Sequence, residues 1–158
     1  MNFIFDRTVG DVYEAIRLNN LKWSNMTPQE QESYLNGLKG SYTINDFNRV
    51  SSIVEELVDL LLSIGIRVTV NIREWKHEDI PDDNKTQEYL DNIRTLREAF
   101  RVLPTTPDVP DNMEHFNFES ANNIEQILFD LHLLIDSTKR NKDLSWCLGI
   151  AHTGIYVG

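Results

Sequence analysis

One pair of side chains near the C-terminus has the types needed for nucleophilic catalysis, Cys147 and His152. An imidazole can deprotonate a neighbouring thiol, and the thiolate can then attack a carbonyl carbon. Here no obvious third group would orient the imidazole, and the pair lies in a glycine-punctuated terminal segment, so a structural cysteine is the stronger interpretation. The sequence also has no phosphate-binding glycine loop, no serine nucleophile elbow and no HExxH zinc helix. We therefore predict that the protein is not an enzyme and uses no cofactor.

Metal-binding chemistry is the other type of site that the side chains suggest. His77, His115 and His132 lie in different segments, which argues against a shared metal site. Residues 79–83 hold three aspartates, and carboxylate oxygens are the ligands that Ca²⁺ prefers. Acids just before a helix are explained equally by capping and by the helix dipole. We therefore predict no metal site.

Composition narrows the function further. The chain of 158 residues has the length of one domain with a substantial core. With 25 acidic and 15 basic residues its net charge is -10, so the basic footprint of a nucleic-acid-binding protein is missing. No apolar run approaches the roughly 18 residues of a membrane span, and the first residues lack the pattern of a signal peptide. We expect a protein made in the cytoplasm, with neither nucleic acid nor membrane as a partner.

The stretch from Ser41 to Gly65 is the longest periodic segment and should form the central helix. Its apolar residues recur at alternating steps of three and four, which places them on one helical face. Thr43 is the expected N-cap, with Asp46 at the third helical position as its capping-box partner. Gly65 is a natural terminator. The inner face of this helix comprises Phe47, Val50, Val54, Leu57, Leu61 and Ile64.

A second helix, from about Phe118 to Lys139, repeats this pattern 74 residues later. Asn122 falls where the central helix has Asn48. Two interpretations stay open: two amphipathic helices that look alike by chance, or a pseudo-symmetric pair whose asparagines hydrogen-bond at a helix crossing, since a buried amide must find partners. Under both interpretations these asparagines, like Thr43 and Asp46, are structural. The inner face of the second helix comprises Ala121, Ile124, Leu128, Leu131 and Ile135.

The remaining segments complete a mainly α fold. Helices are predicted from Thr8 to about Asn19, from Thr27 to near Gly37, and from about residue 83 through Leu103. Residues 66–73 alternate apolar and polar side chains, the mark of a half-buried strand. The sequence thus predicts an antiparallel bundle of about five helices with a small β element. In the first two helices we expect these apolar residues to face inward: Val9, Val12, Tyr13, Ile16, Tyr34, Leu35 and Leu38.

The last fifteen residues, 144–158, differ from the helical domain formed by residues 1–143. They combine large apolar side chains with three glycines. One interpretation is a C-terminal hairpin around residues 151–154, pairing with the strand at 66–73. The other is an arm that becomes ordered against a neighbouring subunit, because exposed apolar patches tend to mark contacts. The residues predicted to bind the partner are Trp146, Ile150, Ile155 and Tyr156.

Six phrases, in order between residues 6 and 138, carry a resemblance to a known family. They are Asp6-Arg7-Thr8 with Asp11-Val12; Leu38-Lys39-Gly40-Ser41-Tyr42-Thr43 leading into Asp46-Phe47-Asn48-Arg49-Val50; Trp75 with Asp79-Ile80-Pro81; Tyr89-Leu90-Asp91-Asn92-Ile93-Arg94 with Leu96-Arg97; Leu103-Pro104 with Pro107 and Pro110; and Glu119 with Ala121-Asn122-Asn123-Ile124-Glu125. With these phrases the chain resembles a helical domain that recurs in tail and minor structural proteins of phages and prophages of Gram-positive bacteria. Beyond Lys139 the chain departs from that pattern.

The resemblance implies a structural protein of a phage virion, made in the cytoplasm of the bacterial host. We expect an assembly or adaptor component of the tail or baseplate, a homo-oligomer in the virion, docked onto other tail or baseplate proteins. One alternative is a receptor- or carbohydrate-binding module at the tail tip, which would expose Trp23 and Trp75 in one aromatic patch. Another is a wall hydrolase, which needs paired carboxylates that the sequence does not show.

Overall fold

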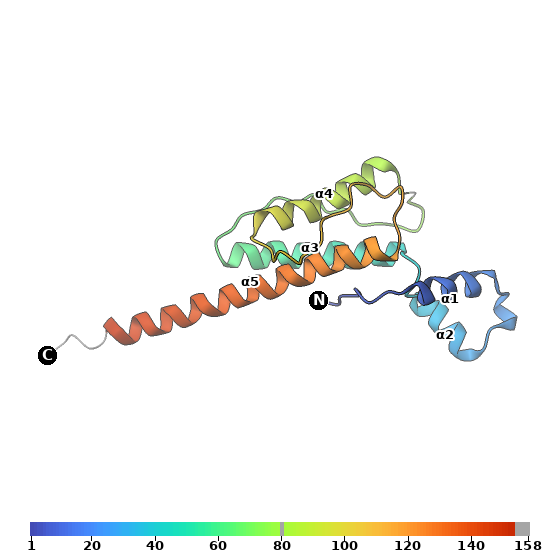
Figure 1. Cartoon of the computed structure of the whole chain (residues 1–158), viewed down its shortest axis with the longest axis horizontal. Helices are drawn as coiled ribbons and strands as arrows, with labels where there is room; N and C mark the ends of the chain where they lie inside the picture. The colour runs from blue at the N-terminus through green and yellow to red at the C-terminus, as the bar shows by residue number, and fades with distance from the viewer. Residues whose placement is uncertain (80, 154–158) are drawn as a thin grey trace.

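The structure of the protein is a computed structural model that describes residues 1–79 and 81–153 (Figure 1). The described residues form five α-helices and one short 3-10 helix, and they include no β-strand. The prediction of a mainly helical bundle is therefore confirmed. The elements are α1 (Val9–Asn20), η1 (Trp23–Asn25), α2 (Pro28–Asn36), α3 (Ile44–Ser63), α4 (Asp83–Ala99) and α5 (Phe118–Thr153).

The core is a bundle of three helices, α3, α4 and α5, each of which packs against the other two. Their inner faces carry apolar residues at helical spacing, so each helix buries one stripe and exposes the opposite side. The stripes predicted for the central helix and for the last helix are buried, apart from half-buried Ile64. Fully enclosed side chains of this core include Val50, Leu57, Leu61, Leu90, Ile93, Leu96, Ile124, Leu128, Leu131 and Ile135.

The three core helices run in the same direction, so the antiparallel arrangement was wrong (Figure 1). The rings of Phe47 and Tyr89, near the starts of α3 and α4, have centroids 4.9 Å apart. Arg49, also near the start of α3, donates to Glu125 in the first part of α5. The two connections between these helices make the parallel course possible. Each has about 18 residues at about 3.3 Å per residue, enough to return along a helix of about 30 Å.

Residues 66–73 form part of the first return connection, and the strand predicted there is not formed. The alternation itself is present, since residues 66, 68, 70 and 72 are half-buried against the core while their neighbours are exposed. The segment lies beside helices, whose backbone groups are already bonded, so a ladder has no partner. The side-chain amide of Asn92 on α4 takes the place of a strand partner. Its oxygen accepts from the backbone N–H of Asn71 at 2.8 Å, and its nitrogen donates to the backbone carbonyl oxygen of Asn71 at 2.8 Å.

The C-terminal hairpin is also not seen. Residues 144–153, where its first strand and turn were expected, continue α5 as helix to Thr153. Ile155 and Tyr156 lie outside the described residues, as does the remainder of 154–158. The chain needs no turn before Thr153 because α5 can continue away from the bundle without meeting another element (Figure 1).

Helices α1 and α2 form a separate hairpin at one end of the three-helix bundle (Figure 1). Both begin where predicted, and each start is a complete capping box, Thr8 with Asp11 and Thr27 with Glu30. Their inward faces were predicted only in part: Val12 and Leu38 are half-buried, but the other five residues are exposed. α1 instead turns Ala15 and Leu18 toward α2 and the turn at 37–40. The residues expected inside but found exposed are Val9, Tyr13, Ile16, Tyr34 and Leu35.

Candidate functional site

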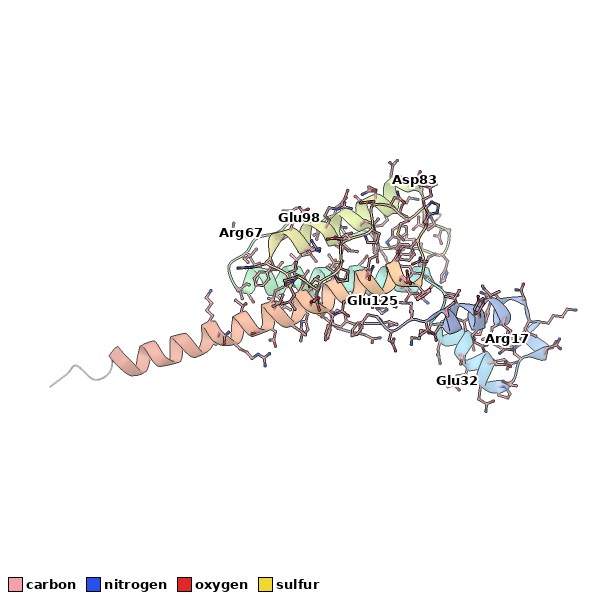
Figure 2. All side chains as sticks on the ribbon, in the orientation of Figure 1. Arg17, Glu32, Arg67, Asp83, Glu98 and Glu125 are labelled. Carbon is pink, nitrogen blue, oxygen red and sulfur yellow. The ribbon has the colours of Figure 1, made fainter. Side chains whose placement is uncertain are left out.

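Four charged side chains from distant parts of the chain meet where the N-terminal segment crosses α3 and α5. Glu125, labelled in Figure 2, is fully buried. It accepts from Arg7 Nη1 at 2.8 Å, and from Arg49 Nη1 and Nη2 at 2.6 and 2.8 Å. Asp46 accepts from the same two arginines at 3.0 and 2.8 Å. We call Arg7, Asp46, Arg49 and Glu125 the ionic cluster; two cations and two anions make it neutral.

Every polar edge of Arg7 in the ionic cluster has a partner. Its Nε donates to the carbonyl oxygen of Lys39 at 3.2 Å, and Nη1 donates to that of Ile4. Its guanidinium carbon lies 5.4 Å from the ring centroid of Tyr42, a cation–π contact. A buried ion pair is tolerated only when its remaining hydrogen-bonding groups are satisfied. The ionic cluster meets this condition, so its geometry is that of a clamp between segments.

The protonation of these groups supports the same interpretation. Burial lowers the pKa of Arg49, but hydrogen bonds to Glu125 and Asp46 outweigh it and leave the pKa above its ordinary value. Burial also raises the pKa of Tyr42, whose hydroxyl shares a hydrogen bond of 2.6 Å with that of Tyr89. Such groups hold their protons throughout the neutral range, so neither can serve as a general base there.

Two helical asparagines each pair with the backbone of one residue in an extended segment. Asn48 accepts from the N–H of Trp75 and donates to its carbonyl oxygen, both at 2.8 Å. Asn122 does the same with Arg7, at 3.0 and 2.8 Å. The matched positions on α3 and α5 therefore make the same contact, although with return and N-terminal segments rather than with the opposite helix. Each side chain replaces a missing strand partner.

The predicted capping residues lie at the start of α3. Asp46 Oδ2 accepts from the backbone N–H of Thr43 at 2.9 Å and from its hydroxyl at 3.1 Å. The other carboxylate oxygen, Oδ1, accepts hydrogen bonds from both arginines of the ionic cluster. One carboxylate therefore links the start of α3 to the N-terminal segment.

The second notable feature is the part of α5 after Ile135, which projects beyond the other helices (Figure 1). Ile135 is fully buried, and all seven side chains from 137 to 143 are exposed. From there α5 runs away from the other elements to Thr153, and it carries two of the predicted partner-binding residues, Trp146 and Ile150 (Figure 1). The other two, Ile155 and Tyr156, lie outside the described residues.

The residues considered for catalysis or metal binding are spread over the molecule. Cys147 and His152 lie in the part of α5 that follows Ile135, whereas Glu125 of the ionic cluster precedes it. Nδ1 of His132 is buried and has no hydrogen-bond partner among the described residues. Asp82 accepts from the backbone N–H of Lys85 at 2.9 Å, which is ordinary N-capping of α4, and Asp79 accepts from that of Lys76 at 2.8 Å within a turn. In the described part of the chain no group of three or more His, Cys, Asp or Glu is arranged to hold a metal ion.

An open groove of about 420 Å³ lies between α1, α2 and the turn at 37–40. Arg17 donates to Glu14 and to Glu30 there, and Lys39 lies 2.9 Å from Asp6. The pKa of Glu30 is lowered to about 2, mainly because its carboxylate accepts a hydrogen bond from Arg17. These carboxylates stay ionised and paired, which makes them parts of the α1–α2 hairpin rather than proton donors.

The tryptophan platform expected of a carbohydrate-binding module is not formed by the two residues named for it. Trp75 is 3% exposed and packs its ring against Phe47, with centroids 4.6 Å apart. Trp23 is 48% exposed, on the α1–α2 hairpin. Among the described residues, no helix combines the length and apolar character needed to span a membrane.

The ionic cluster was not predicted from the sequence. One signal was present: Glu125 directly follows Ile124 and precedes Leu128 by three, so it lies beside the buried stripe of α5. A carboxylate there needs a cationic partner. Comparison with known proteins adds no identification: no family model matches the chain, and neither do curated proteins or solved structures.

Proposed function

We propose that the protein is a structural component of a phage virion, an assembly or adaptor protein of the tail or baseplate. It docks onto other tail proteins through residues 144–158, with residues 1–143 as its folded domain. The observation that carries this proposal is the course of α5, which leaves the core after Ile135 and projects alone.

The sequence of the projecting part explains why it needs a partner. After the polar run 137–143 come Leu144, Trp146, Leu148 and Ile150 within seven residues. Covering apolar side chains with another protein removes their surface from water, which contributes about 25 cal/mol per Å².

The folded domain supports the same role. The phrases that carry the resemblance to phage tail proteins supply all four members of the ionic cluster, Arg7, Asp46, Arg49 and Glu125. These residues fasten the N-terminal segment to α3 and α5, so they serve rigidity rather than chemistry. A rigid domain with an apolar projection suits a protein that is built into a larger particle in several copies.

The proposal is tested by deleting residues 144–158 in a host that produces the particles. The truncated protein should stay folded, with the unfolding midpoint of the full chain, and should be absent from purified particles. Leu35→Ser, at an exposed position on α2, is the matched control and should enter particles normally. Incorporation of the truncated protein at the normal level would contradict the docking role.

A second outcome bears on the domain division. If the truncated chain unfolds, residues 144–158 belong to the core and do not form an arm. The receptor- or carbohydrate-binding alternative has no comparable support, because burial of Trp75 removes one of the two aromatic rings on which it depended.

A further inference from the structure

Helix α2 ends on an asparagine that is followed by glycine, and Asn36-Gly37 is the only Asn-Gly step in the sequence. The side-chain amide carbon of an asparagine can be attacked by the backbone nitrogen of the next residue, which closes a five-membered ring. Glycine leaves that nitrogen least hindered, because it has no Cβ. The residue types at this step are therefore those of a spontaneous covalent modification.

The structure leaves this step open to solvent. Asn36 and Gly37 are both exposed. The backbone N–H of Gly37 donates to the carbonyl oxygen of Tyr34 at 3.4 Å, which is long for a hydrogen bond and holds the nitrogen only weakly. Gly37 has a φ of +92°, and a Cβ placed on it would meet nothing within 4 Å. A ring that forms here has room around it.

Ring closure requires the end of α2 to open, because helical dihedrals do not bring the side-chain carbon of Asn36 onto the next backbone nitrogen. α2 has nine residues and none of them is buried. A helix of this length is marginal unless packing holds it, and its last turn opens at little cost in free energy. The reactive conformation is therefore within reach of the folded protein.

We propose that Asn36 is a site of spontaneous deamidation in the folded protein. The backbone nitrogen of Gly37 bonds to the side-chain carbonyl carbon of Asn36, and the amide nitrogen leaves with the proton of Gly37 as ammonia. Water then adds to one of the two carbonyl carbons of the cyclic imide and opens the ring. The product is aspartate or isoaspartate, in which the main chain runs through the side-chain carbon. Water is the only co-reactant.

Both products add a negative charge at an unfavourable place. The C-terminal end of a helix dipole disfavours an anion, and residue 36 is the last of α2. Asn36 also lines the open groove between α1 and α2, together with the carboxylates of Asp11, Glu14 and Glu30. The new charge would therefore lie in a groove that already contains three acids.

Isoaspartate has a second effect, because it lengthens the main chain by one carbon directly before the turn at 37–40. This turn packs closely on α1, since a Cβ on Gly40 would lie 2.0 Å from the carbonyl oxygen of Asp11. A longer chain cannot keep the same approach. The hairpin lies at one end of the molecule, so the modification should loosen α1 and α2 and leave the three-helix bundle unchanged (Figure 1).

Peptide mapping of the purified full-length protein, kept for weeks in a mildly alkaline buffer, tests the proposal. Trypsin releases residues 23–39 as one peptide, which contains both Asn25 and Asn36. Asn25 is the internal control: it is exposed, and the next backbone N–H, that of Met26, is also hydrogen-bonded, at 3.2 Å. Deamidation should be about tenfold faster at Asn36, because glycine and not methionine follows it. Equal rates at the two asparagines would overturn the proposal.

The free peptide of residues 23–39 shows whether the reaction belongs to the folded state. Its rate at Asn36 is the rate without structure. Since only the end of α2 must open, the folded protein should react within about a hundredfold of the peptide. A slower reaction would mean that the modification waits for a larger unfolding, and this would contradict the proposal.

Hydrogen exchange measures the consequence for the hairpin. After ageing, amides of α1 and α2 should exchange severalfold faster, whereas those of residues 121–135 in α5 should not change. Asn36→Gln would need a six-membered ring, so the aged variant should match its fresh form. Fresh Asn36→Asp carries the charge without the longer main chain and should show only part of the increase. Unchanged exchange in α1 and α2 after conversion of Asn36 would contradict the loosening.

Discussion

Glu125 connects three segments through one side chain: α5, α3 through Arg49, and the N-terminal segment through Arg7 and the backbone N–H of Ile4, 2.5 Å away. The carboxylate is fully buried, so the two arginines depend on it for compensation of their charge. Because the arginines come from different elements, loss of this charge should affect the whole core rather than one helix.

Replacing Glu125 with glutamine should destabilise the protein by about 3–5 kcal/mol, because it leaves buried positive charge with only Asp46 to balance it. Chemical denaturation followed by circular dichroism measures this free energy of unfolding. Glu119→Gln removes an exposed acid from the first turn of the same helix and should cost less than about 1 kcal/mol. Equal stability of the two variants would show that the ionic cluster does not hold the core.

Glu30 makes a pH-dependent contribution to the stability of the α1–α2 hairpin. The hydrogen bond from Arg17, followed by those from the backbone and hydroxyl of Thr27, lowers its pKa from 4.5 to about 2. Since the folded pKa is the lower one, its stabilisation is fully present above pH 4.5 and is lost as pH falls toward 2.

NMR titration of the Glu30 carboxyl should show a midpoint near 2 in the wild type, and Arg17→Gln should move it upward toward 4.5. The control is Arg94→Gln, which removes a cation on α4 that pairs with Asp91 and should leave the Glu30 midpoint unchanged. A wild-type midpoint close to 4.5 would mean that the contact with Arg17 is not formed in solution.

Residue-scale features were predictable where their partners are close in sequence. Thr43 and Asp46 lie three apart, which is the spacing of a capping box, and both are found together at the start of α3. Arg7 and Glu125 lie 118 residues apart, and no local spacing marks such a pair. The asparagines were predicted to be structural, but their backbone partners, Trp75 and Arg7, depend on the paths of the first connection and of the N-terminal segment.

At the scale of elements, the parallel course of α3, α4 and α5 explains the extended connections. Each connection must return along the bundle, and its backbone groups need partners that helices cannot supply. In the first connection Asn48 and Asn92 meet this need, each pairing with both backbone groups of one residue, and Asn122 does the same for Arg7 in the N-terminal segment. The period of two at 66–73 correctly indicated an extended, half-buried segment; pairing depends on a neighbouring strand, which periodicity does not reveal.

The α1–α2 hairpin depends on a close approach at Gly40. A Cβ placed on Gly40 would lie 2.0 Å from the backbone carbonyl oxygen of Asp11, so α1 would have to move. Gly40→Ala should therefore destabilise the protein by about 1–3 kcal/mol. Thermal unfolding measures the effect, and loss of the Lys39 to Asp6 contact would accompany it.

Gly10→Ala is the matched control, because Gly10 lies within α1 and its added Cβ meets nothing closer than 3.5 Å. Alanine is the better helix former there, so stability should rise by up to about 1 kcal/mol. If Gly40→Ala proves as stable as the wild type, the turn at 37–40 does not pack against α1 as described.

At the scale of the whole molecule, α5 divides into a buried part and a projecting part. The apolar stripe of this helix stops at Ile135, and the sequence predicted that the helix would end near Lys139. The helix continues because residues 137–148 include no proline and no glycine, while its stripe stops because no neighbour remains to cover it. Glycines from Gly149 onward suggested a hairpin, yet Gly149 lies within α5.

Hydrogen exchange along α5 tests the central claim most directly. In the isolated monomer, amides of residues 121–135 should be protected to the limit of global unfolding, and those of residues 137–153 should exchange rapidly. In assembled particles, residues 144–153 should become protected. Equal protection of the two parts in the monomer would show that the end of α5 packs against its own core, and that would contradict its role as the docking arm.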